Sequence, residues 1–278
     1  MEYDLKKYKN PVVICYGSRF SPFTLYNLKV VEDLTNDIYN SHNKERDIIL
    51  YFIPTSDKFN SINVKSSYIN GNSNKERIKM LEIVCNVLNK KNKHIQYKIS
   101  DNEIKKKNAI YTYDTVRNIQ QFIYKKSDVA ILNNDIQVIL NEDRLREMLK
   151  GEWNNALSLL SKNIIVVPTN HNKINTADLF KNINLKKMIS NEKYFKDKNN
   201  LELLIHDRDY LMSKFYIYNK MTKQIMDSHP LHIYNKLQDF YNRKITMAEL
   251  NTYLMPEISA YIVQHNLYKK NNKTRKNK

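Results

Sequence analysis

The segment YGSRFSPFTLYNL, residues 16–28, continues directly from the apolar run PVVICY, residues 11–16. A glycine–serine turn between a buried strand and a helix presents backbone N–H groups at the helix N-terminus, where phosphate binds favourably. An enzyme that transfers phosphate groups also needs a cation or an imidazole at the start of that helix. The residues at these places are Thr24 and Asn27, and neither side chain can carry a positive charge. The segment therefore predicts a nucleotide-binding turn whose chemistry is incomplete.

The chain is strongly basic. Its 46 Lys and Arg residues exceed its 29 Asp and Glu residues by 17, and the sequence pI is near 9.5. A metabolic enzyme does not need such an excess, whereas a protein that lies on a phosphate backbone does. An AT-rich genome would also raise the Lys, Asn, Ile and Tyr content, but it would not explain the small number of acids. The composition therefore favours RNA as the partner.

Cysteine usage and hydropathy bear on where the protein acts, and the two isolated cysteines indicate a reducing compartment. Cys15 and Cys85 both lie in apolar contexts, with neither a disulfide framework nor the spacing of metal ligands. No stretch approaches the roughly 20 apolar residues of a membrane span. Residues 1–10 lack the apolar core of a secretory signal. We expect a cytoplasmic protein with no metal site and no membrane partner.

Strand and helix patterns alternate along most of the chain. Continuous apolar runs predict buried strands at residues 11–16, 47–54, 95–100, 136–140, 163–168 and 215–218. Apolar spacing predicts helices at residues 25–40, 73–88, 112–125, 143–150, 231–242 and 258–268. This alternation is typical of an α/β fold, a Rossmann-like doubly wound parallel sheet, here with a C-terminal helical segment.

Residues 1–268 are predicted to form a single domain, with a Lys/Asn-rich insertion at about 172–214. Thr246 is a candidate helix cap near the C-terminal end of this domain. Residues 269–278 form a basic tail of low complexity that cannot bury a core. The cations of this tail are expected to contact RNA phosphates, and they are Lys269, Lys270, Lys273, Arg275, Lys276 and Lys278.

The turn and several later segments resemble the eukaryotic nicotinamide/nicotinic-acid mononucleotide adenylyltransferases. That family has a Gly-Ser-Phe-x-Pro-x-Thr/His-x-x-His-Leu turn, which this chain matches with one inserted residue, Arg19. Residues 74–86, NKERIKMLEIVCN, resemble the family's Tyr-His-Arg-x-x-Met-x-Glu helix, and residues 249–270 resemble its C-terminus. The resemblance implies a sheet of the nucleotidyltransferase type. It also implies nucleotide-binding positions at Gly17, Ser18, Phe20, Asp143 and Trp153, the last where the family's Trp stacks on the nicotinamide ring.

The departures from the family pattern fall on the groups that stabilise phosphate charge. In the family a mononucleotide phosphate attacks the α-phosphorus of ATP, and histidines and a Ser-Ser-Thr-x-x-Arg motif stabilise the charge. Asn27 stands where the family has its second histidine, and Tyr234 stands where it has the arginine. Thr24 agrees with eukaryotic members. Each lost charged contact costs on the order of 3 kcal/mol of transition-state stabilisation. We therefore expect Thr24, Asn27 and Tyr234 to be vestigial catalytic positions.

Two functions follow from these observations. The first is a pseudoenzyme that needs no cofactor and binds RNA, in particular ribosomal RNA with ribosomal proteins; its sharpest version is a ribosome inactivation or dormancy factor. The alternative is an active nicotinamide mononucleotide adenylyltransferase, which forms NAD from NMN and ATP with Mg²⁺. The alternative requires Arg19, His229 or His232 to replace the lost charge. It predicts an open cleft around Gly17 and Trp153, whereas the first predicts an occluded or empty one.

Overall fold

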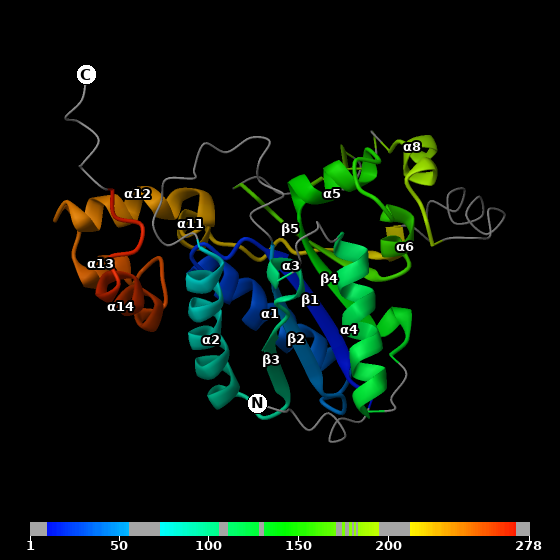
Figure 1. The fold of residues 1–278 in the computed structure, drawn as a ribbon, viewed down its shortest axis with the longest axis horizontal. Helices are drawn as coiled ribbons and strands as arrows, with labels where there is room; N and C mark the ends of the chain where they lie inside the picture. Colours follow the sequence, from blue (N-terminus) through cyan, green and yellow to red (C-terminus); the bar gives the residue numbers. More distant parts are fainter. Residues whose placement is uncertain are drawn as a thin grey trace.

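A parallel sheet forms the centre of the molecule (Figure 1). The computed structural model describes residues 10–55, 73–105, 111–127, 131–170, 174–175, 178–179, 181, 183–194 and 212–270. Its strands are β1 (Val12–Ser18), β2 (Ile48–Pro54), β3 (Ile95–Ile99), β4 (Ile136–Asn141), β5 (Asn163–Val167) and β6 (Phe215–Ile217). Their order is β3-β2-β1-β4-β5-β6, and every neighbouring pair is parallel. The predicted doubly wound α/β fold is confirmed.

Helices cover both faces of this sheet. The longer ones are α1 (Leu25–Ser41), α2 (Asn74–Lys91), α4 (Thr112–Ser127), α5 (Glu142–Leu149), α12 (Pro230–Tyr241) and α14 (Pro256–Gln264). The shorter ones are α3 (Asn102–Lys105), α6 (Ala156–Leu160), α8 (Leu185–Ser190), α11 (Lys223–Asp227) and α13 (Met247–Leu250). Among the described residues, no helix is long and apolar enough to cross a bilayer.

The two faces of the sheet build two separate hydrophobic clusters. Successive side chains of a strand point to opposite faces. Ile14 and Tyr16 accordingly belong to the cluster under α1, α2 and the C-terminal helices, whereas Val13 and Cys15 belong to the cluster under α4, α5, α6 and α8. Because both faces are covered, the central strands β1 and β2 are buried and apolar over most of their length, which is the pattern that predicted them.

The short helices are the elements that the sequence pattern did not predict. Four of them, α3, α6, α8 and α11, have four to six residues, which is too few to display a 3.6-residue period. The predicted cap at Thr246 is confirmed, since its hydroxyl accepts a hydrogen bond from the Glu249 N–H at 3.2 Å. Most of the predicted insertion lies outside the described residues. One described part of it, α8, packs into the second cluster through Met188, which is fully buried.

The strand order reverses direction between β1 and β4. In doubly wound sheets, ligands bind at such a switch point, in the crevice beyond the carboxyl ends of the strands. The turn of residues 17–24 and the first turn of α5 follow β1 and β4 directly at this place. The fold therefore positions the predicted nucleotide turn where this class of sheet places its ligands.

Candidate nucleotide site

The turn after β1 is fixed by a buried guanidinium. Arg77, on α2, is fully buried. Its Nη1 donates to the carbonyl oxygens of Arg19 at 2.9 Å and Thr55 at 2.8 Å, and its Nη2 donates to Asn74 Oδ1 at 2.5 Å. One side chain thereby ties the chain that leaves β1 to the chain that leaves β2.

Gly17 borders open space at the end of β1. Among the described residues, no heavy atom lies within 4 Å of the place that a Cβ at Gly17 would occupy, apart from its chain neighbours. Gly17 and Ser18 are both partly exposed. Packing therefore does not require a glycine here, and the turn retains room for a group that approaches the backbone closely.

Asn27 is used within the protein. Its side chain is 1% exposed, and its Oδ1 accepts hydrogen bonds from the Thr24 N–H at 3.0 Å and the Thr24 hydroxyl at 3.2 Å. Its Nδ2 donates to the Tyr16 hydroxyl at 2.9 Å. Thr24 is also fully buried. The Asn27 side chain therefore completes a capping box with Thr24, the N-cap of α1, and it brings neither charge nor exposure to the crevice.

Phe20 belongs to the core beneath the turn. It is 1% exposed, and its ring meets those of Tyr16 and Phe52 edge to face, with centroids 5.2 and 5.6 Å apart. It stacks on Phe23 at 5.8 Å. The matched phenylalanine thus supports the turn from below, and its ring does not face the open end of the sheet.

Tyr26 and His229 occupy the region between α1 and the end of β5. The Tyr26 hydroxyl donates to the carbonyl oxygen of Pro168, directly after β5, at 2.5 Å. The His229 ring packs edge to face against Tyr26, with centroids 4.6 Å apart, and both side chains are buried. β4 lies between β1 and β5. These two rings therefore fill the part of the crevice on the β5 side of the switch point.

The surroundings of His229 keep its imidazole neutral. Burial, together with the neighbouring His232, lowers the pKa of His229 to about 4, and the negative charge of Asp143 opposes this shift. A histidine with this pKa carries no charge at pH 7, so His229 brings no positive charge to this region. His232 is exposed on the next turn, and its ring centroid lies 6.3 Å from that of His229.

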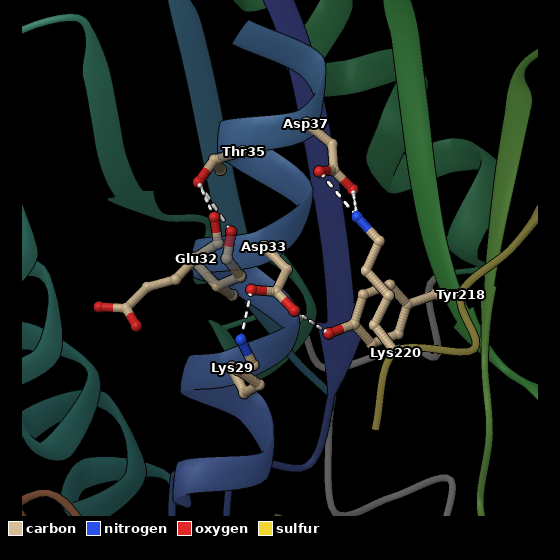
Figure 2. A network of polar contacts seen from close by, with 8 residues as sticks. Lys29, Glu32, Asp33, Thr35, Asp37, Tyr218 and Lys220 are labelled. Atoms are coloured by element: carbon tan, nitrogen blue, oxygen red, sulfur yellow. Dashed lines mark hydrogen bonds and ion pairs between the residues drawn. The ribbon is translucent and has the colours of Figure 1, made fainter. Parts of the chain in front are cut away.

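A polar network holds the segment after β6 against α1 (Figure 2). The buried Tyr218 donates its hydroxyl hydrogen to Asp33, and Lys220 forms an ion pair with Asp37 at 2.6 Å. Burial and the neighbouring Asp33 raise the pKa of Tyr218. The network therefore fixes the segment that leads into α11 on the middle turns of α1. His229, directly before α12, contacts Tyr26 in the first turn of α1.

The remaining predicted positions lie around this crevice. Tyr234 lies on α12 and packs, half-buried, against the first hydrophobic cluster. Asp143 is exposed in the first turn of α5. Trp153 packs against the second cluster, and its Nε1 donates to Glu147 Oε2 at 3.3 Å. Tyr234 adds no positive charge, and Trp153 is held against α5.

Arg19, the inserted residue, supplies a cation within the turn. Its side chain is partly buried, and its Nε has no hydrogen-bond partner among the described residues. The Ser21 and Tyr268 hydroxyls lie 3.1 Å apart nearby, and the charges of Arg19 and Arg77 both lower the pKa of Tyr268 against the rise caused by burial. The C-terminal segment therefore closes onto the same turn.

Two of the predicted tail cations lie within the described residues. Lys269 and Lys270 are exposed, and Lys269 Nζ lies 5.6 Å from the centroid of the Tyr241 ring. Lys273, Arg275, Lys276 and Lys278 lie outside the described residues. Within the described ranges, no group of three or more His, Cys, Asp or Glu could hold a metal ion.

Sequence reasoning missed the roles of Tyr26 and Arg77. Arg77 matched a family motif, but its role as the link between the ends of β1 and β2 depends on distances across the sheet. Tyr26 gave no signal, because an aromatic residue in the first turn of an amphipathic helix is ordinarily read as core.

The fold and the position of the turn define the class as a Rossmann-like fold of the nucleotidyltransferase type. Two solved structures of this class are similar to the chain, both of Plasmodium falciparum nicotinic acid mononucleotide adenylyltransferase. The structure complexed with APC has a TM-score of 0.54 at 16% identity, and that complexed with NaAD has 0.55 at 15%. Each comparison covers 93% of this chain and 98% of the other. No protein-family model and no curated protein sequence matches the chain.

Proposed function

We propose that this chain is a nucleotidyltransferase-fold protein that has lost adenylyl transfer and binds RNA. The observation that carries the proposal is the state of Asn27, which is buried and bonded to Thr24 and Tyr16. Catalysis of phosphoryl-group transfer depends on positioned charge at the phosphates. Asn27 and Tyr234 supply none, and the low pKa of His229 prevents it from doing so.

The expected loss of activity is large. Two missing charged contacts at about 3 kcal/mol each correspond to a rate about 10⁴-fold below that of an intact enzyme. Purified protein, incubated with ATP, Mg²⁺ and either NMN or nicotinic acid mononucleotide, is expected to form no dinucleotide above background, as measured by chromatography. Turnover within a factor of ten of an ordinary adenylyltransferase, assayed in parallel, would sink this part of the proposal.

Charge supports RNA as the partner. The net charge of +17 and the exposed Lys269 and Lys270 at the root of the tail complement a phosphate backbone. Ribosomal RNA with its proteins is the partner that we propose, in a cytoplasmic protein, and occupation of a ribosomal functional site during dormancy is the most specific form of the proposal.

Association with ribosomes is expected to be strong and sensitive to salt. In sedimentation with purified ribosomes, removal of residues 269–278 should weaken binding and lower the slope of log K against log salt, because each phosphate contact contributes about 0.7 to 0.9 to that slope. Replacing the same ten residues by a Gly/Ser sequence of equal length separates charge from length. Unchanged binding after either modification contradicts the role given to the tail.

The second candidate is an active mononucleotide adenylyltransferase that makes NAD from NMN and the Mg²⁺ complex of ATP. It is favoured by the similarity to structures that bear this enzyme's name, by the open space at Gly17 and by the Nε of Arg19, which has no partner among the described residues. If the assay detects turnover, Arg19→Ala should reduce it by about 10²-fold or more, because Arg19 would then carry the phosphate charge.

A further inference from the structure

The outer face of α4 concentrates exposed aromatic side chains. Of the seven large hydrophobic side chains that are exposed among the described residues, four lie on α4 or directly beside it. They are Tyr111, Phe122, Tyr124 and Tyr194. Phe122 and Tyr124 are 48% and 55% exposed. Aromatic rings in solvent at this density usually mark a contact surface.

Cations lie between these rings. Val116, Ile119 and Ile123 face the second hydrophobic cluster, which fixes the orientation of the helix. Residues four apart share a helix face, so the exposed Arg117, Gln121 and Lys125 form a stripe on the opposite side. Phe122 and Tyr124 flank this stripe, one on each side, and the exposed Lys126 follows on the side of Phe122. The face thus carries both rings and positive charge.

Tyr194 is held in place at the N-terminal end of this face. Its hydroxyl donates to Asp114 Oδ1 at 2.9 Å, and the Arg117 guanidinium carbon lies 4.9 Å from its ring centroid. Asp114 is the carboxylate of the face, and its charge is thereby engaged by Tyr194. The remaining charges, those of Arg117, Lys125 and Lys126, are positive.

We propose that the outer face of α4 binds a single-stranded segment of RNA. Bases would stack on Phe122 and Tyr124, while Lys125, Lys126 and Arg117 contact the phosphates. Interleaved rings and cations are what single strands require, because their bases are free to stack, whereas a duplex hides its base faces and presents mainly backbone. α4 covers the sheet face opposite to α1, so this surface is separate from the crevice at β1 and β4 (Figure 1).

The proposal rests on the proposed RNA binding and names the surface that performs it. Fluorescence anisotropy with labelled 12-nucleotide oligouridine and with a 12-base-pair RNA duplex tests it on the full chain. The F122A/Y124A variant should bind oligouridine at least tenfold more weakly and the duplex within twofold of the unmodified protein. Tyr216→Ala is the control, because it removes a ring on β6 that is 45% exposed. The affinity of this variant for each RNA should lie within twofold of that of the unmodified protein.

Further variants separate stacking from charge. K125A/K126A should weaken binding of both RNAs and reduce the salt slope for oligouridine by about 1.4, from two phosphate contacts. If the F122A/Y124A variant binds oligouridine as tightly as the unmodified protein, the assignment of this surface is wrong, although the proposed RNA binding is not. Competition by polyglutamate at the same charge concentration as RNA also overturns it, in favour of an acidic peptide. Absence of any RNA binding by the unmodified protein overturns the proposed function as well.

Discussion

Replacing Arg77 by leucine is expected to lower the free energy of unfolding by about 4 kcal/mol, although leucine suits an apolar interior. Arg77 is fully buried and donates to the carbonyl oxygens of Arg19 and Thr55 and to Asn74. Leucine leaves these buried acceptors without their donor, and each unsatisfied group costs about 1 to 3 kcal/mol. The loss should appear in urea unfolding as a lower midpoint at unchanged slope.

Two further variants make this result specific to the guanidinium. Arg77→Lys keeps the charge but not the planar fork that reaches both carbonyls, so its stability should lie between those of the leucine variant and the unmodified protein. Arg144→Leu removes an exposed arginine that pairs with Glu147 at 2.8 Å, and it should cost less than about 1 kcal/mol. An Arg77→Leu variant as stable as Arg144→Leu would contradict the linking role of Arg77.

Replacing Glu103 by glutamine is expected to stabilise the protein by roughly 3 kcal/mol above pH 7 and by almost nothing near pH 4.5. Glu103 is 5% exposed, and burial raises its pKa to about 7, while a hydrogen bond from the Thr115 hydroxyl at 3.0 Å opposes the rise. In the unfolded chain the carboxyl ionises near pH 4.5. The folded state therefore holds the extra proton between these values, and stability falls as the pH rises through them.

Glutamine keeps the oxygen that accepts from Thr115, but it cannot ionise. The gain in stability therefore appears only at pH values where Glu103 of the unmodified protein would ionise. Urea unfolding of both proteins at pH 4.5 and pH 8 measures the difference, with Glu257→Gln, an exposed glutamate of α14, as the matched control. A gain of the same size at both pH values would show that ionisation of Glu103 is not its cause.

Ionisation of His229 changes the stability with pH in the direction opposite to that of Glu103, over a similar pH range. Its pKa in the folded protein is about 4, below the ordinary value of 6.5, so the unfolded chain takes up the proton first. Stability from this residue is present above pH 6.5 and is lost as the pH falls towards 4. In the Glu103→Gln protein, the trend from His229 is therefore expected to be more visible than in the unmodified protein.

Asn27 and His229 are both buried, and their packing bears on the proposed loss of catalysis. Groups that stabilise the phosphate charge of a transition state must point at the place where that charge develops. In this chain Asn27 bonds to Thr24 in the capping box of α1, and His229 lies against Tyr26. Both side chains are therefore occupied by packing within the protein, which supports the proposed loss of catalysis.

Much of the fold could be predicted from the sequence because its signals are local. A short uninterrupted apolar run such as residues 48–54 is typical of a strand that is covered on both faces, and β2 occupies these residues. The Thr246 cap and its Glu249 partner lie three residues apart, so their contact is visible in the sequence. The short helices escaped prediction because their start and end depend on tertiary contacts, as α8 does on the burial of Met188.

The sequence by itself determined the succession of strands and helices along the chain, the Gly-Ser turn after the first strand, and the absence of positive charge at Asn27 and Tyr234. These are properties of residue type and spacing along the chain. Only the tertiary structure decided that Asn27 bonds to Thr24 and Tyr16, that His229 is neutral, and that Arg77 joins two strand ends. Hydrogen bonds join residues as far apart in the sequence as Ser21 and Tyr268, with a separation of 247 positions. Such contacts are set by the packing of the whole sheet and not by local pattern.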